Sequence, residues 1–145
     1  MILGATNRPF DLDDALLRRM PRKLLIDLPD KVGRAEILRL QLRGETLGNG
    51  VDIDQLASLT KDYSGSDLKS VCIAAALSAA REQIALEKDG KEVSKRVLSW
   101  DHFLKALKEI KASTSNETST SVELRRWDDM FGEGKKKRKK HVGFS

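Results

Sequence analysis

The sequence predicts an α/β remnant, the end of a parallel sheet, followed by a mainly α-helical bundle of about four helices and one further C-terminal helix. Two short apolar runs, residues 1–5 and 23–28, are each closed by turn-forming residues, which is typical of buried strands. From Gly33 onward, apolar residues recur instead at the three- and four-residue spacing of amphipathic helices.

The first 31 residues are expected to form one strand–helix–strand unit. A helix over residues 12–19 is expected to begin after Asp11 as its N-cap and to end before Pro21. Strands at 1–5 and 23–28 joined by this helix would make a parallel crossover, the last unit of an α/β sheet. Two strands do not form a stable sheet alone, so we expect the chain to be part of a larger domain.

Four helices are expected between residues 32 and 111. The first ends near Gly44, the long third helix opens with a capping box of Ser64 and Asp67, and the fourth begins after Ser99. Helices of this size can share one core. The apolar residues expected on their inward faces are, helix by helix, Val32, Ile37, Leu38 and Leu42; Ile53, Leu56, Ala57 and Leu59; Leu68, Val71, Cys72, Ala75, Ala76 and Ala79; and Trp100, Phe103, Leu104, Leu107 and Ile110.

Three further segments are expected after the bundle. Residues 112–119 are rich in Ser and Thr and almost free of apolar residues, which indicates a linker. Residues 120–132 are expected to form a last helix, opened by a capping box of Thr120 and Glu123. Its apolar residues share one side and are Leu124, Trp127 and Phe131. Residues 133–145 are expected to form a disordered basic tail.

The charge of the chain is concentrated in that tail. The formal net charge is +5, and without the six basic residues of the tail run, 21 basic residues face 22 acidic ones. Three uses of the run remain open: a solvated tail, an import-receptor or nucleic-acid patch, and attraction to anionic lipid at about 1 kcal/mol per basic residue. No aromatic residue is interleaved for base stacking, which disfavours nucleic acid. The run is Lys135, Lys136, Lys137, Arg138, Lys139 and Lys140.

Other residue types exclude several classes of site. The single cysteine excludes an internal disulfide, and no Cys/His cluster has the spacing of metal ligands, so no metal site is expected. No apolar run approaches the roughly 18–20 residues that span a bilayer.

Three polar residues near the N-terminus are candidates for phosphate chemistry. Asn7 follows the first predicted strand, where open α/β sheets bind ligands, so its amide could orient a water or contact a phosphate. Arg18 and Arg19 end the predicted helix, away from Asn7, and fit arginine fingers that act on a neighbour's nucleotide, worth about 10³–10⁵ in rate. The alternatives are a turn residue for Asn7 and, for the arginines, cations that favour a helix dipole by about 0.3–1 kcal/mol.

Four motifs occur in the order seen in AAA ATPases, so that residues 1 to about 111 resemble this family. They are Gly4-Ala5-Thr6-Asn7-Arg8-Pro9, the run Leu12-Asp13-Asp14-Ala15 with Arg18-Arg19, Leu28-Pro29-Asp30, and Tyr63-Ser64-Gly65-Ser66-Asp67-Leu68. Within the superfamily the chain resembles the branch of katanin, spastin, fidgetin and the mitochondrial outer-membrane AAA translocase. Arg18-Arg19-Met20-Pro21 is most similar to the translocase.

The resemblance implies a role for each candidate residue. Asn7 matches the sensor-one residue, while Arg18 and Arg19 match fingers that reach into the next subunit of a homohexamer. Residues 1–31 match the C-terminal end of the large, P-loop-type ATPase subdomain, and residues 32–111 match the helical lid that covers adenine. The lid positions that match ATP contacts are Ile37, Gln41, Gly65 and Ser66, of which Gln41 departs from the histidine of some relatives.

The function that this resemblance implies is ATP-driven extraction or remodelling of protein substrates, at a membrane such as the mitochondrial outer membrane and facing the cytosol. The full-length ATPase would use ATP and Mg²⁺. This chain alone is expected to bind neither and to be inactive, because it has no G-x-x-x-x-G-K-[ST] phosphate loop and no strand ending in an acidic pair. The alternative is a non-catalytic helical interaction module whose basic tail serves nuclear import or lipid binding.

Overall fold

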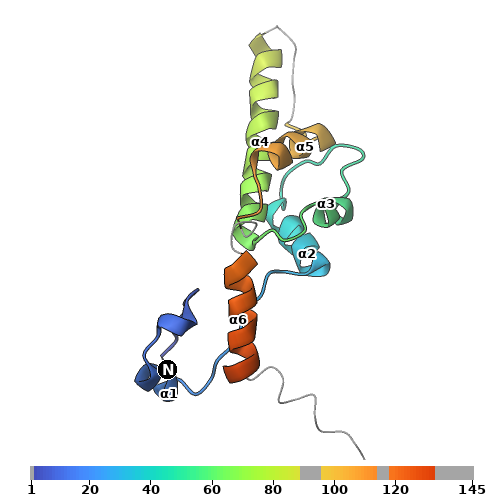
Figure 1. Cartoon of the computed structure of the whole chain (residues 1–145). Helices are drawn as coiled ribbons and strands as arrows, with labels where there is room; N and C mark the ends of the chain where they lie inside the picture. The colour runs from blue at the N-terminus through green and yellow to red at the C-terminus, as the bar shows by residue number, and fades with distance from the viewer. Residues whose placement is uncertain (1, 89–95, 114–117, 133–145) are drawn as a thin grey trace, which may run out of the picture. The chain divides into compact units, whose positions relative to one another are not determined.

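The computed structural model describes residues 2–88, 96–113 and 118–132 (Figure 1). Their contacts divide the chain into two compact units, Leu28–Asn116 and a second unit of Met1–Asp27 with Glu117–Ser145. The first unit holds α2 (Lys31–Gln41), α3 (Ile53–Leu59), α4 (Gly65–Lys88) and α5 (Trp100–Glu109); the second holds the short 3-10 helix η1 (Pro9–Asp11), α1 (Asp14–Arg19) and α6 (Thr118–Phe131).

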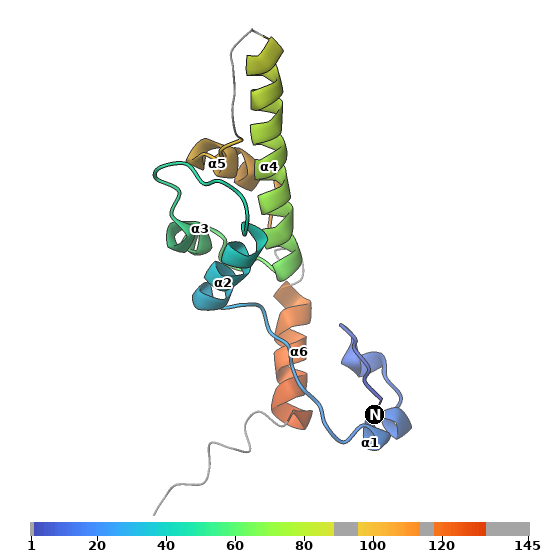
Figure 2. The same ribbon diagram turned by 180° about the vertical axis from the view of Figure 1, so that it is seen from behind.

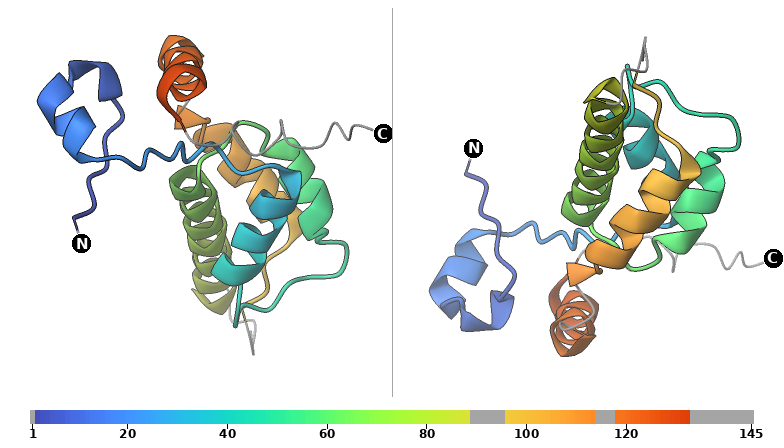
Figure 3. Two further views of the ribbon diagram at one scale, coloured as in Figure 1. Left: turned by 90° about the horizontal axis from the view of Figure 1, so that it is seen from below. Right: turned by 90° about the horizontal axis from the view of Figure 1, so that it is seen from above.

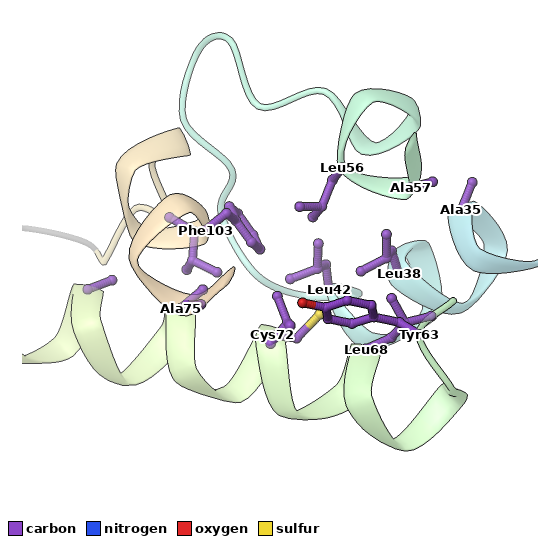
Figure 4. Packing of buried hydrophobic residues seen from close by; sticks show 14 residues of the cluster. Ala35, Leu38, Leu42, Leu56, Ala57, Tyr63, Leu68, Cys72, Ala75 and Phe103 are labelled. Atoms are coloured by element: carbon purple, nitrogen blue, oxygen red, sulfur yellow. The ribbon is translucent and has the colours of Figure 1, made fainter. Parts of the chain in front are cut away.

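The four helices of the Leu28–Asn116 unit share one hydrophobic core, as the sequence predicts. α4 packs against both α2 and α5, and α2 packs against α3. All three shorter helices lie on the same side of α4 (Figures 1 and 2), and from above α5 lies between α4 and α3 (Figure 3). Figure 4 shows the side chains that meet in the middle. The buried apolar residues are Ala35, Leu38, Leu42, Leu56, Ala57, Tyr63, Leu68, Val71, Cys72, Ala75, Ala79, Leu98, Phe103 and Ala106.

Some predicted core positions are wrong. Val32, Leu59 and Leu104 are exposed, because the buried stripe of each helix lies on a neighbouring face. The structure also buries several polar side chains, among them Arg34 and His102, which the helical spacing of apolar residues does not reveal. Both are satisfied by partners in the bundle, as buried polar groups must be. His102 accepts a hydrogen bond from the Ser99 N–H at 3.0 Å and thereby caps the start of α5.

The capping box predicted at the start of α4 is confirmed. The Ser64 N–H donates to the Asp67 carboxylate at 2.9 Å, and the Asp67 N–H donates to Ser64 Oγ at 3.2 Å. Such reciprocal caps satisfy backbone donors that the first turn of a helix leaves unpaired. The cap therefore fixes where the long helix α4 begins.

Residues 96–99 are joined to the loop between α2 and α3 by a parallel bridge of Leu47 and Leu98. The Leu98 N–H donates to the Thr46 carbonyl and the Gly48 N–H donates to the Leu98 carbonyl, each at 2.9 Å. The Arg96 guanidinium also binds Glu45 at 2.6 Å. These contacts position the chain just before α5.

In the second unit, α1 is shorter than predicted and has a different N-cap. Its N-cap is Asp13, whose carboxylate accepts from the Ala15 N–H at 2.7 Å. Asp11, the predicted cap, ends η1 and instead forms an ion pair of 2.7 Å with Arg8. The reason is that Pro9 starts a 3-10 turn, which occupies the residues directly before the predicted helix.

The predicted sheet remnant is not seen, and the described part of the chain is mostly helical. Neither residues 2–5 nor residues 23–28 form a strand among the described residues. Their apolar side chains are largely exposed, at 73–89% for Ile2, Leu3, Leu24 and Ile26. A strand is stabilised only when a neighbouring strand pairs with it, and no strand forms beside these two runs among the described residues.

The C-terminal helix α6 begins at Thr118, two residues earlier than predicted, so the expected capping box at Thr120 and Glu123 falls inside the helix. The rings of Trp127 and Phe131 lie 5.4 Å apart between centroids at a tilt of 44°. α6 packs against η1, and Arg125 forms an ion pair of 3.2 Å with Asp27.

Two predictions concern residues outside the described part of the chain: the middle of the linker, at 114–117, and the basic tail at 133–145. Among the described residues, no helix is both long and apolar enough to cross a membrane.

Candidate functional site

The candidate residues fall into two groups, one in each unit. Asn7, Arg18 and Arg19 belong to the unit that includes α1 and α6, whereas Ile37, Gln41, Gly65 and Ser66 belong to the four-helix unit. The resemblance to AAA ATPases predicts phosphate chemistry for the first group and contacts with adenine for the second.

Asn7 lies in an exposed turn just before η1. The turn is held by its own side chains, because Thr6 Oγ1 accepts from the Arg8 N–H at 3.0 Å and Arg8 in turn pairs with Asp11. Asn7 borders an open hollow of about 660 Å³ between this segment and α6. The other residues around the hollow are Arg8, Phe10, Asp11, Glu123, Arg126 and Met130.

Arg18 and Arg19 occupy the last turn of α1, and both are exposed. Arg18 borders a smaller hollow of about 270 Å³ together with Asp14, Leu17, Lys23 and Phe131. A guanidinium is always charged and presents a planar set of donors that matches phosphate oxygens. The two arginines are therefore available to an anionic ligand, and the structure places neither of them with Asn7 around one hollow.

Ile37 and Gln41 lie one turn apart on α2. Ile37 is half-buried against the common core, while Gln41 is the exposed last residue of the helix. Their four-residue spacing places both side chains on neighbouring positions of one face. Contacts with the core therefore hold Ile37 in place, and the polar Gln41 lies next to it.

Gly65 and Ser66 are the first two residues of α4, and both are exposed. A Cβ built at Gly65 would have nothing within 4 Å. Backbone and ligand can therefore come close at this point, in contrast to Gly48, where a Cβ would lie 3.3 Å from the Leu98 carbonyl oxygen. Because α2 packs against α4, the four-helix unit holds both pairs of candidate residues on one shared core.

Asp67 makes contacts that the sequence analysis did not anticipate. Besides capping α4, its carboxylate accepts from Ser113 Oγ at 2.9 Å and from the Ser113 N–H at 3.2 Å. Burial alone raises the pKa of Asp67, but the hydrogen bonds from Ser64 and Ser113 outweigh it and hold the pKa below its usual range. No local signal reveals this contact, since the two residues are 46 apart in the sequence.

Two other kinds of chemistry find no support in the described residues. Burial raises the pKa of the Cys72 thiol to about 11, so the thiolate that acts as nucleophile or metal ligand is scarce at neutral pH. No three residues of the types His, Cys, Asp and Glu gather as metal ligands in the described part of the chain.

The fold and these positions define a class of protein. Residues 50–95, which include all of α3 and α4, match the AAA+ lid domain family. The chain belongs with the AAA ATPases, as the four sequence motifs predict, and carries their lid domain.

Particular relatives can then be named. The chain is 49% identical over 84 residues to an outer mitochondrial transmembrane helix translocase of Danio rerio, covering 58% of this chain and 22% of that protein. It is 40% identical over 123 residues to a cell division cycle protein 48 homolog of Archaeoglobus fulgidus, covering 81% and 17%. It is 36% identical over 141 residues to a katanin p60 ATPase-containing protein of Danio rerio, covering 91% and 28%. The chain thus spans less than a third of each relative.

Solved structures give the same family. The FIGL-1 AAA domain matches with a TM-score of 0.75 and 29% identity, over 89% of this chain and 43% of that one. Its complex with ADP matches with a TM-score of 0.76 and 28% identity, over 89% and 44%. A structure on katanin self-assembly matches with a TM-score of 0.70 and 26% identity, over 83% and 44%.

Proposed function

We propose that this chain is the C-terminal part of an AAA ATPase that uses ATP hydrolysis to extract or remodel protein substrates. The observation that carries this proposal is the four-helix lid with its exposed start at Gly65 and Ser66, in a chain that as a whole resembles an AAA domain solved with ADP. The name of one relative, a transmembrane helix translocase, supports action on proteins.

In this proposal the chain has five parts. Residues 1–31 end the large ATPase subdomain, 32–111 form the lid and 112–119 the linker, followed by the terminal helix at 120–132 and the basic tail at 133–145. The exposed apolar side chains of the two predicted strands support the first part. These strands would form when the rest of the large subdomain supplies the neighbouring strands, because strand pairing removes both backbone donors and apolar faces from water.

Each candidate residue then has one task. Gly65 and Ser66 would contact the adenine base, with Ile37 and Gln41 beside it, while Asn7 would orient the attacking water. Arg18 and Arg19 would neutralise charge on the nucleotide of the neighbouring subunit of a homohexamer, which is the largest single contribution available to phosphoryl transfer. The described residues offer no cluster of magnesium ligands, so no magnesium contact is assigned to them.

The base site can be tested with Gly65→Ala in the whole ATPase. The new methyl group meets nothing within 4 Å, and alanine favours a helix over glycine, so folding should be unaffected. We expect the affinity for ADP, measured by titration calorimetry, to fall at least fivefold. Gln55→Ala, on the exposed surface of α3, is the matched control and should leave it unchanged. Unchanged affinity in Gly65→Ala would remove Gly65 from the base site.

The proposed fingers can be tested with Arg18→Ala and Arg19→Ala in the same protein. ATP binding should stay nearly intact, while turnover should fall at least tenfold. Arg43→Ala, which removes an exposed arginine of the lid, is the control. Mixing Arg18→Ala subunits with subunits that lack a working phosphate loop should restore part of the activity, because one type of interface then regains both elements. Wild-type turnover in both single variants would contradict the assignment.

The 145-residue chain by itself should show no ATP turnover, since its sequence holds no phosphate loop and no acidic pair at a strand end. If the chain did hydrolyse ATP, and if mutating one of its own residues abolished this activity, the chain would contain a complete catalytic site. If no longer form of the protein binds a nucleotide, that result would instead favour a non-catalytic helical interaction module.

We further propose that the protein faces the cytosol at a membrane, with the outer mitochondrial membrane suggested by one relative. The basic run at 135–140 would bind anionic lipid, or an import receptor if the protein is nuclear. Deleting residues 135–145 should abolish binding to vesicles that contain anionic lipid, and added salt should weaken the binding of the intact chain. Salt-insensitive binding would contradict a Coulombic tail.

A further inference from the structure

The carboxylate of Asp67 joins two parts of the lid that are far apart in the sequence. It caps the first turn of α4 through Ser64, and it holds Ser113, four residues after the end of α5, by two hydrogen bonds of 2.9 and 3.2 Å. One oxygen, Oδ2, accepts from both serines. A displacement of the first turn of α4 therefore disturbs both sets of hydrogen bonds at once.

A second contact draws the same segment to the same end of α4. The Tyr63 hydroxyl donates to the Ile110 carbonyl at 2.7 Å, and the tyrosine ring is buried in the core. Ile110 and Ala112 pack against that core. Figure 1 shows the chain after α5 running back beside α4 toward its first turn. Residues 110–113 are thus anchored next to Gly65 and Ser66 rather than leaving the lid at the end of α5.

We propose that Asp67 is a positioning residue that couples nucleotide binding at Gly65 and Ser66 to the anchoring of Ser113. The inference rests on the proposed function, because it takes Gly65 and Ser66 as the base contacts. Along the chain, Ser113 comes shortly before Thr118, the first residue of α6. The occupied site would hold residues 110–113 at the first turn of α4 more firmly than the empty site.

The physical basis of the coupling is reciprocity. If a nucleotide favours the geometry of the first turn in which Asp67 reaches Ser113, then anchoring Ser113 must strengthen nucleotide binding by the same factor. Hydrogen bonds to a carboxylate are roughly twice as strong as neutral ones, so this contact is strong enough to bias the first turn. Ser113 itself need not touch the nucleotide.

The variant Ser113→Ala tests the coupling in the whole ATPase, with ADP as the probe. It removes the hydroxyl donor from an exposed residue and leaves the cap of α4 intact. We expect ADP affinity to fall about fivefold, near the lower end of typical coupling factors. Ser113→Thr retains a hydroxyl and should restore the affinity. Ser58→Ala removes another exposed hydroxyl hydrogen bond, to the Asp54 carbonyl at 2.8 Å, and is the control.

Amide hydrogen exchange at Ser113 supplies a readout that a purely structural role would not move. ADP should slow this exchange in the wild-type protein by about the same factor, and Asp67→Asn should remove the effect. Melting temperatures measured without nucleotide separate coupling from general loss of stability. The proposal would be overturned if Ser113→Ala lowered the affinity for ADP only in proportion to a lowered melting temperature and Ser113→Thr did not restore it.

The outcome also separates this inference from the proposed function. If Gly65→Ala weakens ADP binding but Ser113→Ala does not, the base site stands and the coupling is overturned. If Gly65→Ala has no effect, the base site itself fails, and the coupling fails with it.

Discussion

Arg34 Nε donates a hydrogen bond of 3.0 Å to the carbonyl oxygen of Ala57, which ties α2 to α3 inside the lid. The same guanidinium donates to the Pro29 carbonyl at 2.9 Å and so also holds the chain that enters α2. The residue is only 7% exposed. A buried cation is tolerated because backbone carbonyls replace the water around it.

Replacing Arg34 by methionine should destabilise the lid markedly. The variant keeps much of the apolar stem but takes the guanidinium donor away from two carbonyl oxygens. Pro29 loses the hydrogen bond from Arg34, and Ala57 keeps only a longer one of 3.4 Å from Thr60 Oγ1. A buried group left unsatisfied costs about 1–3 kcal/mol. Arg39→Met is the control, because Arg39 makes its ion pairs with Glu36 and Asp54 on the surface, where such pairs are worth about 0–1 kcal/mol. Urea unfolding of the 145-residue chain measures both. Equal losses in the two variants would contradict the role assigned to Arg34.

Adjacent residues of α5 should respond very differently to truncation. Phe103 is fully buried, whereas Leu104 is 38% exposed. Phe103→Ala is expected to cost about 3–5 kcal/mol, a large part of the 5–15 kcal/mol by which domains are stable. Leu104→Ala should cost about 1 kcal/mol or less. Thermal unfolding followed by circular dichroism decides, and a larger loss in Leu104→Ala would mean that α5 is rotated from its described orientation.

The parts of the fold that the sequence predicts are those set by local chemistry. The Ser64 and Asp67 capping box depends on residues three apart, and the four lid helices depend on apolar spacing within each helix, so both are readable from the chain. The N-cap of α1 is also local, but two aspartates compete for it. Asp13 takes the cap because Pro9 places Asp11 in a 3-10 turn.

The parts that could not be predicted depend on residues distant in the sequence. The Asp67–Ser113 contact spans 46 residues and the Arg96–Glu45 pair spans 51, and neither leaves a periodic signal. The two expected strands also depend on residues that are distant in the sequence. Their apolar composition is correct for a sheet, but pairing requires neighbours that the described residues do not provide.

Cys72 should resist thiol reagents in the folded lid. Burial raises its pKa to about 11, so roughly one thiol in 10⁴ is ionised at pH 7, and the side chain lies within the core near Leu42 and Tyr63 (Figure 4). Labelling with a maleimide should therefore follow the opening of the lid and speed up in urea. Because Cys72 is the only cysteine of the chain, the labelling reports only on the opening of the lid around this residue. Labelling in native buffer as fast as that of a free peptide thiol would mean that the core around Cys72 is open.

Acid should weaken the lid partly through Asp67. Because its pKa is lower in the folded lid than in the unfolded chain, near 3.9, the carboxylate contributes stability above about pH 4. That contribution is lost as the pH falls through the folded pKa, where the native carboxylate becomes protonated. Asp67→Asn has no such titration, so its deficit in the free energy of unfolding should be largest at pH 6 and should shrink toward pH 2–3. The amide resonances of Ser64 and Ser113 should shift together over this range, since both N–H groups donate to the same carboxylate. A deficit independent of pH, or two separate titrations, would show that Asp67 does not join these segments as a charged group.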